Sequence, residues 1–394
     1  MRRAGVYSVK ARAKWIIVLL VAAAVAGLIF GVRSGVPDRG ARTACPQFTP
    51  MYGLMPLLFR LGVLPKPPSA ASITPSDTAS SIVIRPDRSD QIQCGKTLIK
   101  TIKNVVYAVP KLPDGKSTSL KMDILVPEAA RKRTVVVYVP GGGFVVAAKE
   151  SALNLRTYVA ESGFAVASVQ YRTTRDGANY REGIEDIKAA IRYLRANAAQ
   201  YGIDASAVVV WGESAGGYLA AMVGVTNHDS TFDAGADLNE SSDVQGVIDD
   251  FGASDISKMA ADFDAVTQRA IYSNDGIVHY IGKASDANTL DLGIAATAAN
   301  PLTYIHADAP PFLIFHGNQD RMVSPSQTLI LHDALRAAGV RSNRYVLDGA
   351  GHGDLTFMGD AHSGLLWSTN KVMSLIVDFL NRVNAGSRFA VQAE

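Results

Sequence analysis

Cysteine, histidine and charge are all scarce in this sequence of 394 residues. It contains two cysteines and seven histidines, and no cluster of them has the spacing of metal ligands, so we expect no metal site. Charged residues make up 19% of the chain, and the formal net charge is only +3. Five positive charges precede residue 15: Arg2, Arg3, Lys10, Arg12 and Lys14. Without these five residues the formal net charge of the chain is −2. The basic pI therefore reflects the N-terminus and gives no argument for nucleic-acid binding.

The basic head is followed by a long run without charge, residues 15–32 (WIIVLLVAAAVAGLIFGV). At about 1.5 Å of rise per residue, this run can just cross a hydrocarbon core about 30 Å thick. We interpret residues 1–32 as a basic head and an N-terminal membrane anchor; a cleaved signal segment and a buried soluble helix are the alternatives. Positive charge before the run predicts an extracytoplasmic protein, anchored to the membrane or secreted after cleavage. In that compartment Cys45 and Cys94 can pair as a disulfide, and two separate buried thiols are the alternative.

Residues 33–97 are rich in Pro, Ser, Thr and Gly and are interpreted as a linker. From residue 98 to about 390 strand and helix patterns alternate, which predicts one domain with a mostly parallel central sheet and helices on both faces. An antiparallel hairpin opens the domain at 101–128, and buried strands are expected at 134–140, 164–172, 207–212, 244–252 and 311–317, with a last strand from 343. Helices are expected at about 151–162, 179–200, 215–225, 326–338 and 370–384. The stretch 253–308 breaks the alternation, and we expect it to form a small helical cap over the carboxyl edge of the sheet.

The segment 212–216 (GESAG) matches the pattern G-x-S-x-G and lies between a buried strand and a helix of small residues. Glycines two residues either side of Ser214 allow strand and helix to approach closely, so that the serine is held in a strained turn with its hydroxyl exposed. A buried strand running through a glycine loop into a helix would explain the same residues without chemistry. The strand and helix context favours the nucleophile.

A serine nucleophile needs a histidine base, which in turn needs an orienting carboxylate. Asp320 follows one buried strand, and His352 lies in a glycine-rich loop after the last strand. Both positions are at carboxyl ends of strands, the edge at which Ser214 also emerges. Asp249 and Asp250 end another buried strand and are alternative acids. His316 is expected to pack against or hydrogen-bond the loop of Asp320, and Asp348 and Asp354 are expected to cap the loop around His352.

Attack on a carbonyl also requires donors for the oxyanion that forms. The segment 140–146 (PGGGFVV) follows a core strand, and its glycines allow main-chain N–H groups to approach a ligand closely. We predict an oxyanion hole made of the main-chain N–H groups of Gly142, Gly143 and Ala215. A flexible glycine turn without this role is the alternative.

The motifs GGGF, GESAGG, FHGNQDRMVSPSQ and GAGHG occur in this order over about three quarters of the chain, and with them residues 100–385 resemble the α/β-hydrolase superfamily. Within it, the segment is similar to the hormone-sensitive-lipase-like and feruloyl-esterase-like carboxylesterases. The resemblance implies the α/β-hydrolase fold and a triad of Ser214, Asp320 and His352, in agreement with the spacing argument. One residue departs from the family pattern: Pro140 stands where the family commonly has a histidine that braces the glycine loop. Proline can stiffen the loop but cannot donate a hydrogen bond.

The predicted function is that of a serine carboxylesterase that acts through an acyl-enzyme on Ser214, with a small-molecule ester as substrate and no cofactor. A serine peptidase or amidase of the same fold is the first alternative, although the chain has no room for a propeller-sized extra domain. The second alternative is a non-catalytic binding module that has kept the hydrolase scaffold.

Overall fold

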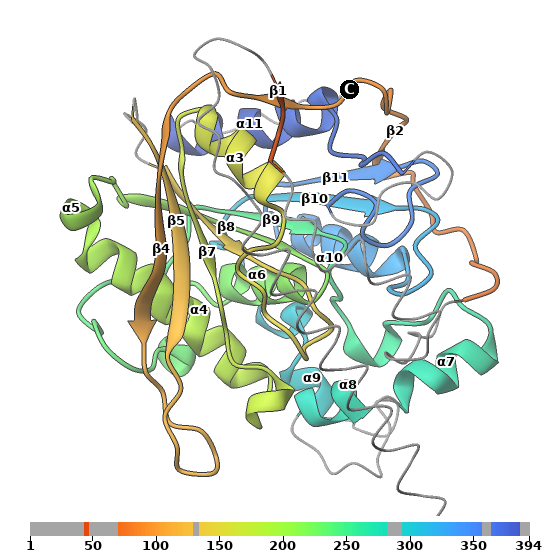
Figure 1. Ribbon diagram of the computed structural model, residues 1–394. Helices are drawn as coiled ribbons and strands as arrows, with labels where there is room; N and C mark the ends of the chain where they lie inside the picture. Colours follow the sequence, from red (N-terminus) through yellow and green to blue (C-terminus); the bar gives the residue numbers. More distant parts are fainter. Residues whose placement is uncertain are drawn as a thin grey trace, which may run out of the picture. The chain divides into compact units, whose positions relative to one another are not determined.

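The computed structural model describes residues 43–46, 70–128, 134–273, 275–281, 294–356 and 364–386 (Figure 1). The predicted membrane segment, residues 15–32, lies outside these residues. Among the helices that are described, none has the length and apolar character needed to span a bilayer.

Nine strands of the described chain form one mixed sheet with the order β2-β11-β10-β9-β8-β6-β7-β5-β4. The strands are β2 (Ile82–Ile84), β4 (Ile99–Ala108), β5 (Leu120–Pro127), β6 (Thr134–Val139), β7 (Ala165–Val169), β8 (Ala207–Glu213), β9 (Gly246–Asp250), β10 (Phe312–Gly317) and β11 (Ser342–Leu347). The hairpin of β4 and β5 is antiparallel, and β5 also pairs antiparallel with β7. All other neighbours in the sheet are parallel. The prediction of a mostly parallel sheet preceded by a hairpin is therefore confirmed.

The central strands are buried and mostly apolar, since helices cover both faces of the sheet (Figure 1). Along β8, Val208 and Val210 join the hydrophobic core on one face, whereas Val209 and Trp211 join the core on the other. One face is covered by α4 (Tyr180–Ala196), α6 (Ala215–Val225) and α10 (Ser326–Ala337), and the other by α3 (Leu153–Glu161) and α11 (Asn370–Asn384). A short helix, α5 (Ala198–Tyr201), follows α4. These helices lie where the sequence predicted them.

The described parts of the chain between β9 and β10 contain short helices and no strand. They are the 3₁₀ helices η3 (Ile256–Lys258) and η5 (Pro301–Tyr304) and the α-helices α7 (Ala265–Tyr272), α8 (Asp275–Tyr280) and α9 (Ile294–Ala298). Met259, Phe263 and Ile271 form a small apolar cluster here with Val323, which follows β10. This cluster connects the inserted helices to the loop that contains Asp320.

Residues 70–97, which the sequence assigns to the linker, belong to the compact unit that contains the sheet. In this range β2 pairs with β11 and becomes an edge strand of the sheet. Ala70 also packs in the cluster of inserted helices, and its N–H donates to the carbonyl of Arg321 at 3.1 Å. A strand of three residues flanked by polar residues has too little apolar pattern to be recognised from sequence.

Cys45 and Cys94 form a disulfide, so the paired alternative is confirmed. The bond joins the two-stranded sheet of β1 (Thr43–Ala44) and β3 (Gln93–Cys94), in which the strands are antiparallel. Both half-cystines are buried in the core under α3 and α11. The disulfide therefore ties the N-terminal part of the described chain to the face of the sheet opposite α6.

Candidate active site

Ser214 lies in a sharp turn between β8 and α6, with backbone angles φ 53° and ψ −119°. A positive φ at a residue with a side chain is strained and persists only where the surroundings enforce it. Here the N–H of Ser214 donates to the carbonyl of Asp250 at 2.8 Å, which fixes the turn to the end of β9. The strained turn exposes the hydroxyl at the carboxyl edge of the sheet, as the G-x-S-x-G pattern predicted.

The flanking glycines are required by space. A Cβ on Gly212 would lie 2.0 Å from the carbonyl oxygen of Gly216, and a Cβ on Gly216 would lie 2.0 Å from that of Val139. The helix thus passes against both its own preceding strand and the neighbouring strand β6. Any side chain at either glycine would push α6 away from the sheet and change the direction of the Ser214 hydroxyl.

The structure brings Ser214, His352 and Asp320 together from three separate loops. Ser214 Oγ lies 3.0 Å from His352 Nε2, and His352 Nδ1 lies 2.8 Å from Asp320 Oδ2. Because Nδ1 faces a carboxylate, it carries the ring proton, and the lone pair of Nε2 points at the serine hydroxyl. This is the arrangement in which an imidazole can take the proton of the serine.

Asp320 is completely buried and accepts four hydrogen bonds. Its Oδ1 accepts the main-chain N–H groups of Met322 and Val323 at 2.8 and 2.9 Å. Its Oδ2 accepts from His352 and, at 3.1 Å, from Nε2 of His316. Burial by itself raises the pKa of the Asp320 carboxyl, but the charge of His352 and the hydrogen bonds from both imidazoles outweigh it and hold the pKa well below its ordinary value.

The pKa of His352 is shifted in the opposite direction. Burial alone would lower it, but the Asp320 carboxylate, through its charge and its hydrogen bond, raises it above its ordinary value. Burial lowers the pKa of His316, so that this second imidazole is neutral and acts as a hydrogen-bond donor to Asp320. Thr328 Oγ1 lies 2.9 Å from its other nitrogen, Nδ1. His316 therefore hydrogen-bonds the Asp320 loop, as expected.

The two alternative acids, Asp249 and Asp250, do not contact His352 in the structure. Asp249 Oδ1 accepts the N–H of Gly252 at 2.8 Å, and Asp250 Oδ2 accepts from Trp211 Nε1 at 2.7 Å. Burial raises the pKa of Asp249 to about 7 and that of Asp250 well above its ordinary value. Each of these carboxyls therefore hydrogen-bonds another partner, and neither is placed to orient the imidazole of His352.

The loop around His352 is held by the two aspartates that were expected to cap it. Asp354 Oδ2 accepts the N–H of Gly351 at 2.7 Å. Asp348 Oδ1 accepts from Asn318 Nδ2 at 2.9 Å, and its other oxygen forms an ion pair with Arg85. The imidazole of His352 also packs edge-on against the ring of Phe251, with centroids 5.0 Å apart.

A cavity of about 170 Å³ opens at the serine hydroxyl. Gly143, Ser214, Ala215 and His352 form its reactive side. The rest of the lining is apolar: Phe144, Ala253, Met259, Ile271, Ile277, Met322 and Val323. The inserted helices thus supply an apolar wall to the cavity, and none of the described residues that line it carries a carboxylate, an ammonium or a guanidinium group.

Two of the three predicted oxyanion donors, Gly143 and Ala215, therefore lie at the cavity. Gly142 does not belong to its lining and helps to form the turn. Its carbonyl accepts the N–H groups of Val145 and Val146, and its φ of 144° leaves no room for a Cβ, which would meet the Val146 carbonyl oxygen at 2.1 Å. An oxyanion role for the Gly142 N–H stays a prediction.

Sequence reasoning did not single out three residues that hold this loop: Tyr171, Thr174 and Glu213. Tyr171 follows β7, and its hydroxyl donates to the Pro140 carbonyl at 2.9 Å. Glu213 is the variable residue inside GESAG and lies next to Gly141. One signal was available, since Tyr171 follows a buried strand at the same carboxyl edge as Ser214.

A family model described as BD-FAE matches residues 122–335 of the chain. This range includes Ser214, Asp320 and the glycine loop and ends before His352.

Among curated relatives, the chain is 28% identical over 221 residues to "Esterase LipQ" of Mycobacterium tuberculosis, covering 55% of this chain and 48% of the relative. "Esterase LipC" of the same organism is 30% identical over 224 residues, which is 56% of this chain and 52% of the relative. The chain thus spans about half the length of these two relatives. Among solved structures, the "Truncated form of carbohydrate esterase from gut microbiota" is similar with a TM-score of 0.59 and 26% identity, covering 74% of this chain and 99% of that one. Together with the mostly parallel sheet covered by helices, this similarity confirms the predicted α/β-hydrolase fold.

Proposed function

The chain belongs to the BD-FAE family, within the esterase and lipase branch of the α/β-hydrolases, and from this membership and the site geometry we propose that it is a serine carboxylesterase. The observation that carries the proposal is the continuous chain of contacts from Ser214 Oγ through His352 to the buried carboxylate of Asp320. Such a chain has a known chemical use in acyl transfer, and a scaffold without catalysis would not need it.

In the proposed reaction, Nε2 of His352 takes the proton of Ser214 as Oγ attacks the ester carbonyl. The main-chain N–H groups of Gly143 and Ala215 donate to the oxyanion, with that of Gly142 as a further predicted donor. The imidazolium then protonates the leaving alcohol, and an acyl-enzyme remains on Ser214. A water molecule gives its proton to His352, attacks the acyl carbon, and the carboxylic acid leaves as the proton returns to Ser214. Asp320 stays ionised throughout and stabilises the imidazolium.

The substitution that tests this proposal is Ser214→Ala. We expect the variant to fold and to lose hydrolysis of p-nitrophenyl acetate, and a fluorophosphonate probe should label the wild type once and the variant not at all. Hydrolysis that persists in the folded variant would refute the assignment. Rates on a matched ester and amide would separate a carboxylesterase from an amidase or peptidase, and the proposal requires the ester to be much faster.

We also propose that the domain acts outside the cytoplasm, anchored by residues 15–32 or released after cleavage. The disulfide between Cys45 and Cys94 supports this location, since such bonds persist in oxidising compartments. Fractionation of cells that express the full chain tests the location: activity recovered only in the cytosol would contradict it.

A further inference from the structure

The loop that contains the proposed oxyanion donors Gly142 and Gly143 must be held in place by residues outside it. We define the oxyanion loop as residues 140–144. Its three glycines have more conformational freedom than any other residue type, and Gly142 and Gly143 both have positive φ, 144° and 59°. Pro140 cannot donate a hydrogen bond to hold this loop. Preorganised donors are effective only if their position is fixed before the reaction, so other residues must hold the loop in place.

We propose that Tyr171 is a positioning residue for this loop: its hydroxyl takes over the bracing that the side chain of Pro140 cannot supply. The inference rests on the proposed esterase function. Tyr171 is 2% exposed, and its hydroxyl donates to the carbonyl oxygen of Pro140 at 2.9 Å. The tyrosine does not reach the cavity, and it acts through the main chain of the loop.

The peptide unit between Pro140 and Gly141 is held from both sides. Tyr171 binds its carbonyl, and Oε1 of the buried Glu213 lies 3.4 Å from its N–H. Rotation of this peptide plane would break both contacts, and it would also turn the amides that follow it, including that of Gly143. Glu213 and Tyr171 together fix the orientation of the peptide unit between Pro140 and Gly141.

The other end of the oxyanion loop, Phe144, is held by Thr174, which lies three residues after Tyr171. The carbonyl of Phe144 accepts the N–H of Thr174 at 3.0 Å and its hydroxyl at 3.1 Å. The ring of Phe144 stacks on Tyr280, with centroids 3.9 Å apart. Tyr171 and Thr174 therefore bind the two ends of the loop, and the glycines lie between these fixed points.

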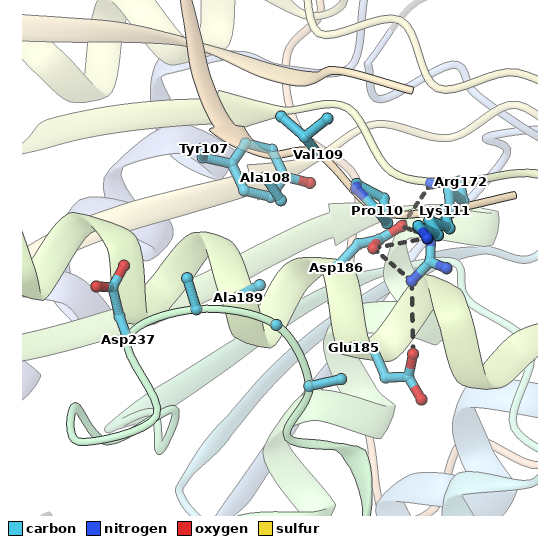
Figure 2. A pocket seen from close by; sticks show the side chains of 13 residues that line it. Tyr107, Ala108, Val109, Pro110, Lys111, Arg172, Glu185, Asp186, Ala189 and Asp237 are labelled. Atoms are coloured by element: carbon cyan, nitrogen blue, oxygen red, sulfur yellow. Dashed lines mark hydrogen bonds and ion pairs between the residues drawn. The ribbon is translucent and has the colours of Figure 1, made fainter. Parts of the chain in front are cut away.

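Tyr171 is anchored to α4 through the residue that follows it, Arg172. The main-chain N–H of Arg172 donates to Asp186 Oδ2 at 2.7 Å, and its guanidinium donates to the same carboxylate through Nε at 3.0 Å and Nη2 at 2.8 Å. Figure 2 shows this pair, with Glu185 beside it, at the wall of a surface cavity. Both partners are largely buried, with side-chain exposures of 11% and 4%. A bidentate ion pair of this kind gives Tyr171 a rigid base from which to hold the loop.

Tyr171→Phe removes one hydroxyl and leaves the ring in place. We expect kcat for p-nitrophenyl acetate to fall by about 10- to 100-fold, since small misplacement of catalytic groups can cost about 100-fold. KM should change by less than about twofold, because the apolar wall of the cavity is untouched. Affinity for a trifluoromethyl ketone, which forms an oxyanion on Ser214, should fall by the same factor as kcat. The pH at which kcat/KM falls on the acid side should stay at the wild-type value, because His352 and Asp320 keep their contacts.

Tyr107→Phe is the matched control, since its buried hydroxyl donates to the carbonyl of Gln170 at 2.5 Å, one residue before Tyr171. Wild-type kcat in Tyr171→Phe, an equal loss in Tyr107→Phe, or a change confined to KM would overturn the proposal. If Tyr171→Phe does not fold, Thr174→Val decides: lower kcat at unchanged KM supports the brace, and wild-type kcat refutes it. A wild type that neither hydrolyses esters nor reacts with a fluorophosphonate refutes the proposed function instead.

Discussion

Replacement of Asp320 by asparagine tests the electrostatic centre of the proposed site. The carboxylate accepts two main-chain N–H groups on Oδ1 and two imidazole N–H groups on Oδ2. Asparagine has one oxygen, and its NH₂ group must face either the two amides or the two imidazoles. In either orientation, two buried donors lose their acceptor and face another donor.

The size of the effect follows from this geometry. Each buried polar group left without a partner costs about 1–3 kcal/mol, so the free energy of unfolding should fall by roughly 2–6 kcal/mol. If the NH₂ group faces His352, the ring must present a lone pair at Nδ1 and move its proton to Nε2, where it can no longer accept from Ser214. Loss of the correct tautomer lowers kcat in a serine triad by about 10⁴-fold. We therefore expect Asp320→Asn to lower kcat by about 10³- to 10⁴-fold.

The pH dependence supplies a second measurement with a definite sign. His352 must be neutral to accept the proton, so kcat/KM should rise as the pH passes through the pKa of His352. Since Asp320 raises that pKa above its ordinary value, the acid limb of the wild type should lie above about pH 6.5. Asp320→Asn removes the raising charge while burial still lowers the pKa. The limb of the residual activity should therefore move to lower pH.

Asp250→Asn is the matched control. Its carboxyl is also buried, but it accepts from Trp211 and its raised pKa keeps it protonated, so an amide can replace it with little change. Kinetics with p-nitrophenyl acetate from pH 5 to 9, with urea unfolding of each variant, make the comparison. Equal losses in both variants, or an acid limb that stays at the wild-type pH in Asp320→Asn, would refute the reasoning.

Two further predictions concern stability. Asp249 binds its proton up to about pH 7 when folded but only to about pH 4 when unfolded, so its burial makes the protein less stable as the pH rises between these values. Asp249→Asn should accordingly exceed the wild type in stability by about 4 kcal/mol at pH 8 and match it near pH 4 in urea unfolding; a gain of the same size at both pH values would contradict this origin. The disulfide joins residues separated by 49 positions, and in the chain-entropy model its removal in a Cys45→Ala/Cys94→Ala variant costs about 4 kcal/mol, with kcat unchanged. An unchanged urea midpoint would show that the bond adds no stability.

Much of the fold could be predicted because its signals are local. The valines of β8 and the glycines on either side of Ser214 define a buried strand, a tight turn and a helix within residues 207–225. The strand β2 could not be predicted from the sequence, since it contains only three residues and owes its place in the sheet to pairing with β11. Short edge strands carry little apolar periodicity, and their partners are distant in sequence.

Part of the candidate site could likewise be predicted from the sequence, and part could not. The order Ser214, Asp320, His352 at strand ends was visible in the sequence, and so was the glycine loop. The ionisation of the acids was not, because the pKa values of Asp249 and Asp320 depend on what is packed around each carboxyl. Both are buried, yet four donors converge on one and a single main-chain N–H reaches the other.

The sequence by itself determined the alternation of strands and helices, the strained serine turn and the edge of the sheet at which the reactive residues emerge, since these follow from the periodicity of side chains and the small size of glycine. Only the tertiary structure decided which carboxyl faces His352, how Tyr171 reaches Pro140, and which side chains wall the cavity. These contacts join residues separated by about 30 or more positions, and their geometry depends on how whole elements pack. The side chain of Pro140 cannot donate a hydrogen bond to the loop. The hydroxyl of Tyr171, which follows the neighbouring strand β7, donates one to the Pro140 carbonyl instead.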